Sequence, residues 1–413
     1  MTPTHAGPAA PDGLPAAQQP DWPDPGRVRA VRAELGALPG LVPAHECDRL
    51  GERLAAVARG EAFLLQGGDC AEEFRRATPG AVHGTAQTLL RMAGALEQAA
   101  GLPVVTVGRL AGQYAKPRSR PTETRGGRTL PAYRGDAVNG AAFTAADRAP
   151  DPRRLLAAYD AARTTLGLMS AYLASARGAA SREVFASHEG LLLDYELPLR
   201  RTDPATGRAY ATSGHLIWAG ERTRGLDDAH IAFLAGIANP VAVKIGPTAR
   251  PGELKELVRR LDPEHRPGRL TFVIRVGARK VRQVLPDLVA AVAETGAPVA
   301  WVCDPMHGNT FEAPTGHKTR HFDDVYDEIA GFFEVHAMLG THPGGVHLEL
   351  TGDEVTECVG GGAGSARGAG VSFADLPWRY ASACDPRLNR SQSLEMGRLI
   401  AGLVAERTRV PVG

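Results

Sequence analysis

Short apolar runs rich in β-branched residues recur along the chain, and most of the intervals between them have helical periodicity. Eight such runs are candidate strands: 62–66, 103–107, 183–187, 215–219, 240–245, 270–276, 298–303 and 345–350. The third interval is the weakest, because only the stretch GLLLDYELPL is available for a helix. Apolar strands that alternate with amphipathic helices indicate a parallel sheet covered by helices. Eight units favour an α/β fold closed into a (β/α)8 TIM barrel over an open doubly wound sheet.

The start of the chain precedes this rhythm. Residues 1 to about 25 are rich in Pro, Ala and Gln, so we expect them to be extended or poorly ordered. Two helices are predicted next, around Arg27–Leu38 and Ala44–Arg59. We therefore expect an N-terminal extension over residues 1–60 and a catalytic barrel over residues 61–413.

Composition narrows the class of protein. Of 413 residues, 43% are hydrophobic, which is enough for a sizeable core, and the net charge is only +1. A near-neutral chain has no global field that would steer it towards nucleic acid or a membrane. No apolar run approaches the roughly 20 residues of a membrane span, and the N-terminus lacks the layout of a signal peptide. Five scattered cysteines without a CxxC pair indicate a reducing compartment, so we expect a cytoplasmic protein without disulfides.

Ionisable residues gather at the ends of the predicted strands. The first four strands run into QGGDCAEEF, GRLAGQYAKPRS, SHEG and GERTRG, and the others end near Lys244, Arg275, DPMHGNT and Glu349. A parallel barrel brings these carboxyl ends to one face. Burying so many charges is costly unless they are paired or bind something charged. The convergence predicts an enzyme active site.

Cations form the first group of candidate site residues. They are Arg109, Arg222, Lys244 and Arg275 at strand ends, with Lys116, Arg118 and Lys318 in nearby loops. Only five of the 47 basic residues are lysine, and these lysines are enriched for places where an ammonium differs from a guanidinium. Any one of these cations alone is more often part of a surface ion pair. Together they suit a small polyanionic substrate, since arginine binds carboxylate and phosphate in a bidentate manner. No GxxxxGK[ST] motif is present, which argues against a P-loop nucleotide site.

Cys70, His307, Glu349 and Asp385 form the second group. A thiolate, an imidazole and two carboxylates from different strand ends could bind a divalent transition metal. Their spacing has no specificity of its own, and a lone cysteine is more often a buried structural residue than a ligand.

Several segments carry a resemblance to a known family. They are LLQGGDCAEEF, VGRLAGQYAKPRS, SHEGLLLDYE, GERTR, NPVAVKIGP, DPMHGNT, HKTRHFDD, GVHLELTGDEVTECVGG and CDPRLNRSQSLE. In this order and spacing they closely resemble the type II 3-deoxy-D-arabino-heptulosonate 7-phosphate (DAHP) synthases. The similarity runs from about residue 15 to the C-terminus. Individually the segments are moderate signals, and jointly they are specific.

The resemblance implies a (β/α)8 barrel that condenses phosphoenolpyruvate with erythrose 4-phosphate and water, giving DAHP and phosphate in the shikimate pathway or in secondary metabolism. It implies a metal cofactor, Mn²⁺ or Co²⁺ in the first place and Zn²⁺ or Fe²⁺ otherwise, as the Lewis acid at the aldehyde. Its ligands would be Cys70, His307, Glu349 and Asp385. Phosphoenolpyruvate would be held by Arg109, Arg222, Lys244 and Arg275, with Glu221 beside them, and the aldose phosphate by Lys116, Arg118, Ser119 and Lys318. Glu221, Lys244 and His307 would be catalytic, and Glu221 is favoured for proton transfer because a metal-bound imidazole is a poor base.

This sequence departs from the family pattern at three places. Val276 stands where Met is usual after the strand-six arginine, and His317 stands where an apolar residue is usual, close to the expected aldose phosphate. The spacer VGGGAGSARGAG is unusually rich in glycine and is interpreted as a flexible linker. Longer members insert a helical pair before strand three and use it to bind aromatic amino acids. Strand three here follows YLASARGAAS directly, so we expect a short form with weak or absent feedback inhibition.

Two other functions remain open from the sequence. The same residues would serve an amino-DAHP synthase that uses a nitrogen-containing analogue of erythrose 4-phosphate. A non-catalytic barrel that binds sugar phosphates would be favoured by loss of a metal ligand, and all four are present. For the enzyme, the expected partners are the two substrates and further copies of the chain in a dimer or tetramer.

Overall fold

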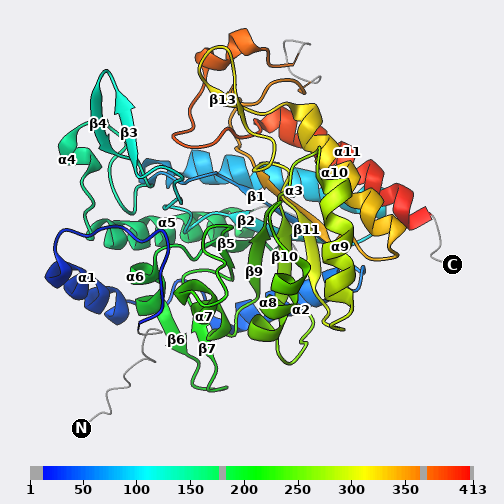
Figure 1. Ribbon diagram of the computed structural model, residues 1–413, viewed down its shortest axis with the longest axis horizontal. Helices are drawn as coiled ribbons and strands as arrows, with labels where there is room; N and C mark the ends of the chain where they lie inside the picture. Colours follow the sequence, from blue (N-terminus) through cyan, green and yellow to red (C-terminus); the bar gives the residue numbers. More distant parts are fainter. Residues whose placement is uncertain (1–12, 176–182, 363–369, 410–413) are drawn as a thin grey trace.

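The computed structural model describes residues 13–175, 183–362 and 370–409 and contains a closed barrel of eight parallel strands (Figure 1). The strands are β1 (Phe63–Gly68), β2 (Val104–Arg109), β5 (Phe185–Glu189), β8 (Leu216–Ala219), β9 (Val241–Ile245), β10 (Leu270–Ile274), β11 (Ala300–Cys303) and β14 (Gly345–Glu349). Each lies within two residues of a run predicted from the sequence. Around the barrel, β1 pairs with both β2 and β14, which closes the sheet. The predicted TIM barrel is confirmed.

Strand register brings the candidate site together. Gly68, the last residue of β1, lies opposite Glu349 of β14 on one side and Arg109 of β2 on the other. At Gly68 φ is +152°, and an added Cβ would lie 2.4 Å from the carbonyl oxygen of Arg109, so a side chain cannot be accommodated there. Because Gly68 has no side chain, β14 with Glu349 and β2 with Arg109 can both pair closely with the end of β1.

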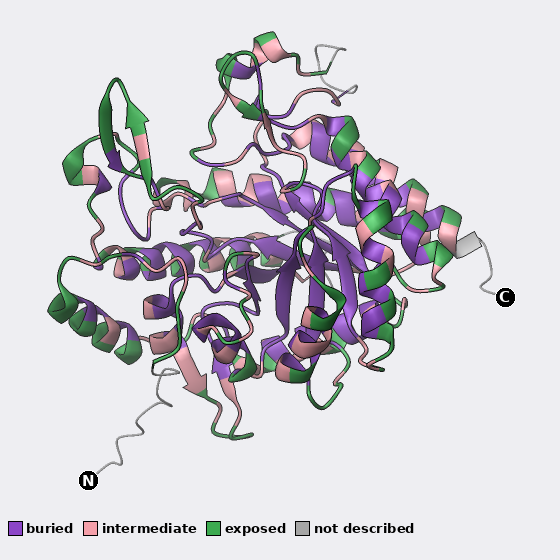
Figure 2. Ribbon diagram, viewed as in Figure 1, coloured by how far each residue is buried: buried purple, intermediate pink, exposed green. Residues whose placement is uncertain are grey.

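Helices cover the outside of the barrel. They are α3 (Pro79–Ala100), α5 (Arg154–Ser175), α7 (Ala229–Ala235), α8 (Pro251–Leu261), α9 (Val281–Ala293), α10 (Phe322–Met338) and α11 (Arg390–Arg409). In α8 the buried residues Leu254, Leu257, Val258 and Leu261 recur at helical spacing and face the strands. Figure 2 shows buried strands inside helices whose outer faces are exposed. The weak third interval contains only α6 (Leu193–Glu196) and η2 (Leu197–Leu199).

Three short hairpins were not expected from the sequence. They are β3 (Thr122–Arg125) with β4 (Arg128–Pro131), β6 (Arg200–Thr202) with β7 (Ala209–Ala211), and β12 (Phe311–Glu312) with β13 (Lys318–Thr319). Their strands are only two to four residues long, too short for the apolar run that marks a barrel strand. Two of them, β3–β4 and β12–β13, stand on either side of the upper face of the molecule in Figure 1. The remaining short elements are α4 (Ala145–Arg148), η1 (Phe74–Arg76) and η3 (Phe373–Trp378).

The N-terminal segment packs against the barrel. Helices α1 (Pro25–Ala37) and α2 (Ala44–Ala58) occupy the predicted positions, and Leu50 and Leu54 of α2 join a cluster with interior strand residues such as Leu64. Residues 13–24 have no regular secondary structure, yet the Gln19 side chain donates to the carbonyl of Leu191 at 2.7 Å. Residues 1–12, and residues 363–369 of the expected Gly-rich linker, lie outside the described part of the chain. The division into extension and barrel stays a prediction.

None of the helices in the described ranges is both long and apolar enough to cross a membrane.

Candidate active site

The four proposed metal ligands lie together at the carboxyl end of the barrel. Single ligand atoms of Cys70, Glu349 and Asp385 lie within 4.8 Å of one another. His307, from the loop after β11, joins this group because its Nε2 is 3.0 Å from Glu349 Oε1. These residues come from the ends of β1, β11 and β14 and from the loop that precedes α11, so only closure of the barrel brings them together.

The chemistry of this group suits a metal ion. Glu349 is fully buried, and its Oε1 faces His307 Nε2, Arg109 and Lys116 at 3.0, 3.3 and 3.5 Å without a well-formed hydrogen bond. This oxygen therefore keeps acceptor capacity that a bound cation can use. One sulfur, one imidazole nitrogen and carboxylate oxygens form a donor set that divalent transition metals accept. The residues present therefore fit a metal of this class.

Lys116 lies among the same groups. Its ammonium contacts Cys70 Sγ and lies 2.5 Å from Asp385 Oδ2 and 3.5 Å from Glu349 Oε1. Burial opposes ionisation of Asp385, but Lys116 and other cations hold the pKa of this carboxyl well below its usual range. Burial likewise opposes ionisation of Glu349, and His307, Lys116 and Arg320 hold its pKa well below normal. Both carboxylates are therefore ionised at neutral pH.

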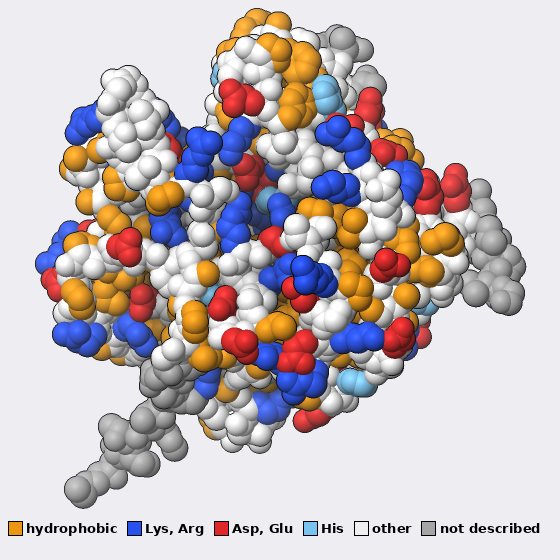
Figure 3. Space-filling view, in the orientation of Figure 1, with side chains coloured by type: hydrophobic (Ala, Val, Ile, Leu, Met, Phe, Trp, Pro, Cys, Tyr) orange, Lys and Arg blue, Asp and Glu red, His pale blue; other side chains and the backbone are white. Residues whose placement is uncertain are grey.

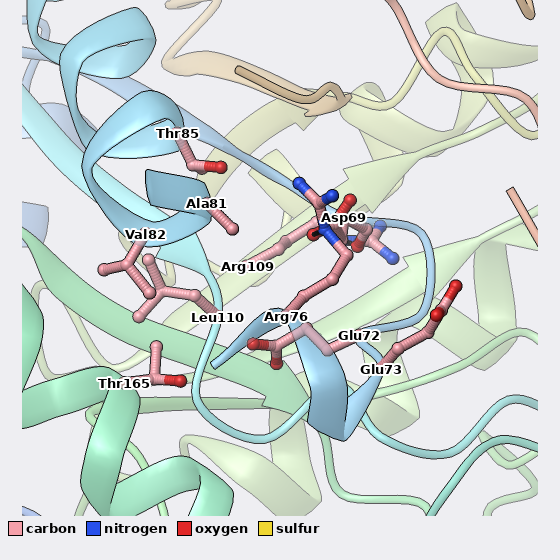
Figure 4. Close-up of a pocket in the computed structure, with 10 residues that line it drawn as sticks. All are labelled: Asp69, Glu72, Glu73, Arg76, Ala81, Val82, Thr85, Arg109, Leu110 and Thr165. Carbon is pink, nitrogen blue, oxygen red and sulfur yellow. Dashed lines mark hydrogen bonds and ion pairs between the residues drawn. The ribbon is translucent and has the colours of Figure 1, made fainter. Parts of the chain in front are cut away.

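Arg109 connects the ends of three strands. Its guanidinium donates to the carbonyls of Asp69 and Cys70 at 3.1 and 3.0 Å, contacts His347 Nε2 at 2.6 Å, and lies 3.3 Å from Glu349 Oε1. Figure 4 shows Arg109 directed towards Asp69 beside a small cavity of about 30 Å³ behind the β1 and β2 loops. This cavity holds about one water molecule. These contacts fix the Arg109 guanidinium at the edge of the site.

Lys244, Asp304 and His307 form a second chain of contacts across the barrel mouth. Lys244 Nζ donates to Asp304 Oδ2 at 2.5 Å, and His307 Nδ1 lies 2.7 Å from the same oxygen. Asp304 is fully buried, and although burial opposes its ionisation, His307 and Lys244 hold its pKa well below normal. The ionised Asp304 Oδ2 accepts a hydrogen bond from His307 Nδ1, and Nε2 of the same ring faces Glu349.

Arg275 borders a larger cleft. It follows β10 directly, and its Nη2 donates to the backbone carbonyl of His307 at 3.2 Å. The cleft has a volume of about 780 Å³, and its lining includes Arg275, His307, Arg279, Lys280 and His321. Arg275, Arg279 and Lys280 outnumber Asp324 among its charged lining residues, so the cleft suits a small anion.

The remaining predicted cations lie at the rim. Arg222 is exposed, and its Nη2 donates to Ser119 Oγ at 2.5 Å, while Lys318 Nζ lies 3.3 Å from Asp385 Oδ1. Arg118 pairs with Glu123 Oε1 at 3.0 Å. Figure 3 shows Lys and Arg side chains around a hollow between the β3–β4 hairpin and the segment that carries β13.

Comparison with known proteins agrees with this geometry. The model of the class-II DAHP synthetase family matches residues 8–180 and 173–401. The chain is 52% identical over 433 residues to a phospho-2-dehydro-3-deoxyheptonate aldolase of Streptomyces coelicolor, covering 94% of this chain and 95% of the relative. It is 46% identical over 442 residues to the aldolase AroG of Mycolicibacterium smegmatis, covering 95% and 93%. The chain belongs to the class-II DAHP synthetase family.

A solved structure of a phospho-2-dehydro-3-deoxyheptonate aldolase from Francisella tularensis is similar with a TM-score of 0.52 and 13% identity, covering 93% of this chain and 97% of that one. At this identity the likeness shows the fold alone, which is the same barrel. The family membership expected from the sequence segments is confirmed.

Within this class-II site, Glu221 has a different setting from the one expected. Both of its carboxylate oxygens are engaged: Arg224 donates to them at 3.0 and 3.1 Å, and the backbone N–H of Gly246 donates at 2.7 Å. A carboxylate held in this way suits the positioning of the loops after β8 and β9. A direct proton-transfer role for Glu221 stays a prediction.

Glu189 is a residue that the sequence reasoning did not assign. It ends β5, and its Oε1 is buried without a hydrogen-bond partner. Burial raises the pKa of this carboxyl, and Lys116, Arg109 and Lys244 partly offset the rise. Its position in SHEG, at a predicted strand end, was the available signal.

Two other unassigned residues stand behind the proposed ligands. Asp304 lies in DPMHGNT and holds both Lys244 and His307, and Arg320 lies in HKTRHFDD and pairs with Glu349 at 2.7 Å. Asp304 stands three residues before His307, but its pairing with Lys244 and the pairing of Arg320 with Glu349 join residues that are distant in the sequence, so spacing does not mark them.

The unusual His317 lies beside Lys318. Its ring contacts the Tyr380 ring at a centroid distance of 5.1 Å, and the Tyr380 hydroxyl donates to the Lys318 carbonyl at 2.9 Å. His317 therefore packs within the loop that carries Lys318.

Proposed function

We propose that this protein is a DAHP synthase that condenses phosphoenolpyruvate with erythrose 4-phosphate. The observation that carries the proposal is the meeting of the Cys70, His307, Glu349 and Asp385 donors with a ring of cations at one barrel mouth. In the reaction, a carbon–carbon bond forms between C3 of phosphoenolpyruvate and the aldehyde carbon. Water adds at C2, and the carbon–oxygen bond to phosphate breaks, so that DAHP and inorganic phosphate result.

The cations bind and orient the two anionic substrates. Arg109, Lys244 and Arg275 border the inner part of the site and are proposed to hold the carboxylate and phosphate of phosphoenolpyruvate, with Arg222 at the rim. Lys116, Arg118, Ser119 and Lys318 are proposed to face the aldose phosphate. Bidentate guanidinium contacts and fixed ammonium groups align both reactants before bond formation, which is the main source of catalytic advantage for such a reaction.

The metal would be held by Cys70, His307, Glu349 and Asp385. When bound, a divalent ion supplies Lewis-acid chemistry that polarises the aldehyde oxygen. We propose Mn²⁺ or Co²⁺, because a mixed sulfur, nitrogen and oxygen donor set accepts both. Asp304 keeps His307 in the tautomer that presents Nε2 to this group.

Glu189 and Lys244 are proposed to hold the water that adds at C2. The unpartnered Oε1 of Glu189 is a ready acceptor for a water proton, and Lys244 stands among the same cations. Glu221 is retained as a positioning group for the Arg222 loop, since Arg224 and Gly246 occupy its oxygens.

The experiment that tests the function uses the full chain after treatment with a chelator. The protein is mixed with Mn²⁺, phosphoenolpyruvate and erythrose 4-phosphate, phosphate release is followed, and the product is identified by mass spectrometry. We expect one DAHP for each phosphate released. Phosphate release that does not depend on the aldose, or product formation only from a nitrogen-containing analogue, would contradict the proposal.

Two further expectations concern the setting of the enzyme. We propose a cytoplasmic location, which the five unpaired cysteines in the described chain support. We also propose a dimer or tetramer, to be measured by light scattering of the full chain.

A further inference from the structure

Arg320 is one of the two largest side chains that are fully buried in the described chain; the other is Arg148. A buried guanidinium is costly unless its donors are satisfied, so the groups that it contacts are held firmly. Its position directly after β13 takes it beneath the proposed metal ligands rather than to the surface.

Each arm of this guanidinium reaches a different part of the ligand group. Nη2 donates to Glu349 Oε2 at 2.7 Å, and Nε donates to the Met306 carbonyl at 2.5 Å. Nη1 donates to the Pro386 carbonyl. Met306 immediately precedes His307, and Pro386 immediately follows Asp385. One side chain thus contacts one proposed ligand directly and the backbone next to two others.

The contact also distinguishes the two oxygens of Glu349. Arg320 donates to Oε2, whereas Oε1 accepts no well-formed hydrogen bond and lies 3.0 Å from His307 Nε2, with Arg109 and Lys116 at 3.3 and 3.5 Å. The hydrogen bond to Oε2 therefore fixes the carboxylate so that Oε1 faces His307.

We infer that Arg320 is a positioning residue that sets the metal-binding geometry of Glu349, His307 and Asp385; this rests on the proposed function, which supplies the metal. The planar fork of arginine is needed, because an ammonium cannot reach three acceptors that lie at the end of β14 and on two different loops. Residues behind metal ligands typically change metal affinity about 10–100-fold when they are replaced.

The test measures Mn²⁺ affinity of chelator-treated full-length protein by electron paramagnetic resonance of free Mn²⁺, together with thermal unfolding. Arg320→Lys keeps the charge and removes the fork, so its Mn²⁺ dissociation constant should rise at least ~10-fold. Arg148→Lys is the matched control. Arg148 is 1% exposed, against 0% for Arg320, and it donates to the carbonyls of Pro131, Ala141 and Ala142, none of which adjoins a proposed ligand in the chain. This control should lower the unfolding temperature and leave Mn²⁺ affinity within about twofold of the unchanged protein.

A milder variant covers the case in which Arg320→Lys does not fold. Thr310 Oγ1 accepts from Arg320 Nε at 3.1 Å, so Thr310→Val removes one contact while the guanidinium remains. We expect about threefold weaker Mn²⁺ binding, because Arg320 Nε loses this longer contact and keeps its hydrogen bond to the Met306 carbonyl. A folded Arg320→Lys variant with unchanged Mn²⁺ affinity would overturn the inference. Equal losses of Mn²⁺ affinity in Arg320→Lys and Arg148→Lys would also overturn it. If Arg320→Lys does not fold, unchanged Mn²⁺ affinity in Thr310→Val would overturn it. If the unchanged protein itself binds no Mn²⁺, the proposed metal site fails instead.

Discussion

Lys244 and Asp304 form a buried ion pair across the ends of β9 and β11, with 2.5 Å between Nζ and Oδ2. The pair is not electrically isolated, because Arg109 and Arg275 face Lys244 as well. Burial and these guanidiniums outweigh Asp304 and lower the pKa of Lys244 to about 8. A lysine proposed to bind phosphoenolpyruvate therefore titrates near pH 8.

The affinity for phosphoenolpyruvate should fall as pH rises through about 8. Lys244 is charged below this pH and neutral above it, and an anion binds better to the charged form. The effect on folding has the opposite sign. Between about pH 8 and pH 10.5 the unfolded chain holds the Lys244 proton that the folded chain has lost, so this group raises the free energy of unfolding as pH rises. Isothermal titration calorimetry from acid to alkaline pH would measure the dissociation constant. Lys244→Arg stays charged, and its affinity should not change across this window; a parallel fall in this variant would contradict the assignment.

Cys70→Ser should weaken metal binding far more than it weakens folding. The change removes a soft sulfur ligand and nearly keeps the volume of a fully buried side chain. We expect the Mn²⁺ dissociation constant to rise at least ~10-fold, with activity recovered in part at high Mn²⁺. Cys303→Ser is a matched control, since Cys303 is equally buried but lies within β11. Unchanged metal affinity and turnover in Cys70→Ser would remove this residue from the proposed site.

The metal-free enzyme should lose activity in air. The side chains of Cys70 and Cys384 pack together with Tyr133 in one buried cluster. We therefore expect the two thiols to come within disulfide distance once the metal no longer shields Cys70. A reductant with added metal should restore activity, and Cys384→Ala should prevent the loss. Mass spectrometry of the oxidised protein should find a peptide linking the two cysteines, and its absence would refute this mechanism.

Aromatic amino acids should inhibit the enzyme weakly or not at all. Helix α5 ends at Ser175 and β5 begins at Phe185, so the connection is shorter than one average helix of about 11 residues. It leaves no room for the helical pair that longer members are expected to use for binding these effectors. Initial rates with phenylalanine, tyrosine and tryptophan, singly and combined, should stay close to the uninhibited rate. Strong inhibition at micromolar concentration would contradict this expectation.

Glu328→Gln should weaken phosphoenolpyruvate binding by about tenfold, the equivalent of one hydrogen bond. Glu328 is fully buried on α10; its Oε1 accepts from the N–H groups of Val276 and Gly277 at 3.0 and 2.8 Å, and its Oε2 from Asn309 Nδ2 at 2.8 Å. Glu328 thereby holds the loop after Arg275 against the loop after His307. In Glu328→Gln the side-chain NH₂ group would face the NH₂ group of Asn309. The dissociation constant for phosphoenolpyruvate gives the measurement.

The control for this variant is Glu46→Gln, which alters the contact of Glu46 with His215 at the opposite end of the barrel. It should lower stability without changing phosphoenolpyruvate affinity. Equal loss of affinity in both variants would show that Glu328 acts only through general stability.

The sequence by itself determined the barrel and the chemistry at its mouth. Apolar runs ending in residues such as Arg109, Lys244 and Glu349 specify parallel strands, and parallel closure must bring their carboxyl ends together. Local sequence signals were sufficient because each of these strands ends in its own ionisable residue. The position of that residue along the strand decides at which end of the barrel it lies.

Only the tertiary structure decided which groups pair. Both oxygens of Glu221 are taken by Arg224 and Gly246, whereas Glu189 keeps an unpartnered oxygen, and nothing in GERTRG or SHEG distinguishes these outcomes. Arg320, which follows β13, donates to Glu349 at the end of β14 and to the carbonyls next to His307 and Asp385. Such contacts join residues far apart in the chain, so they depend on strand register and loop packing. The periodic pattern of apolar residues within one segment carries no information about either.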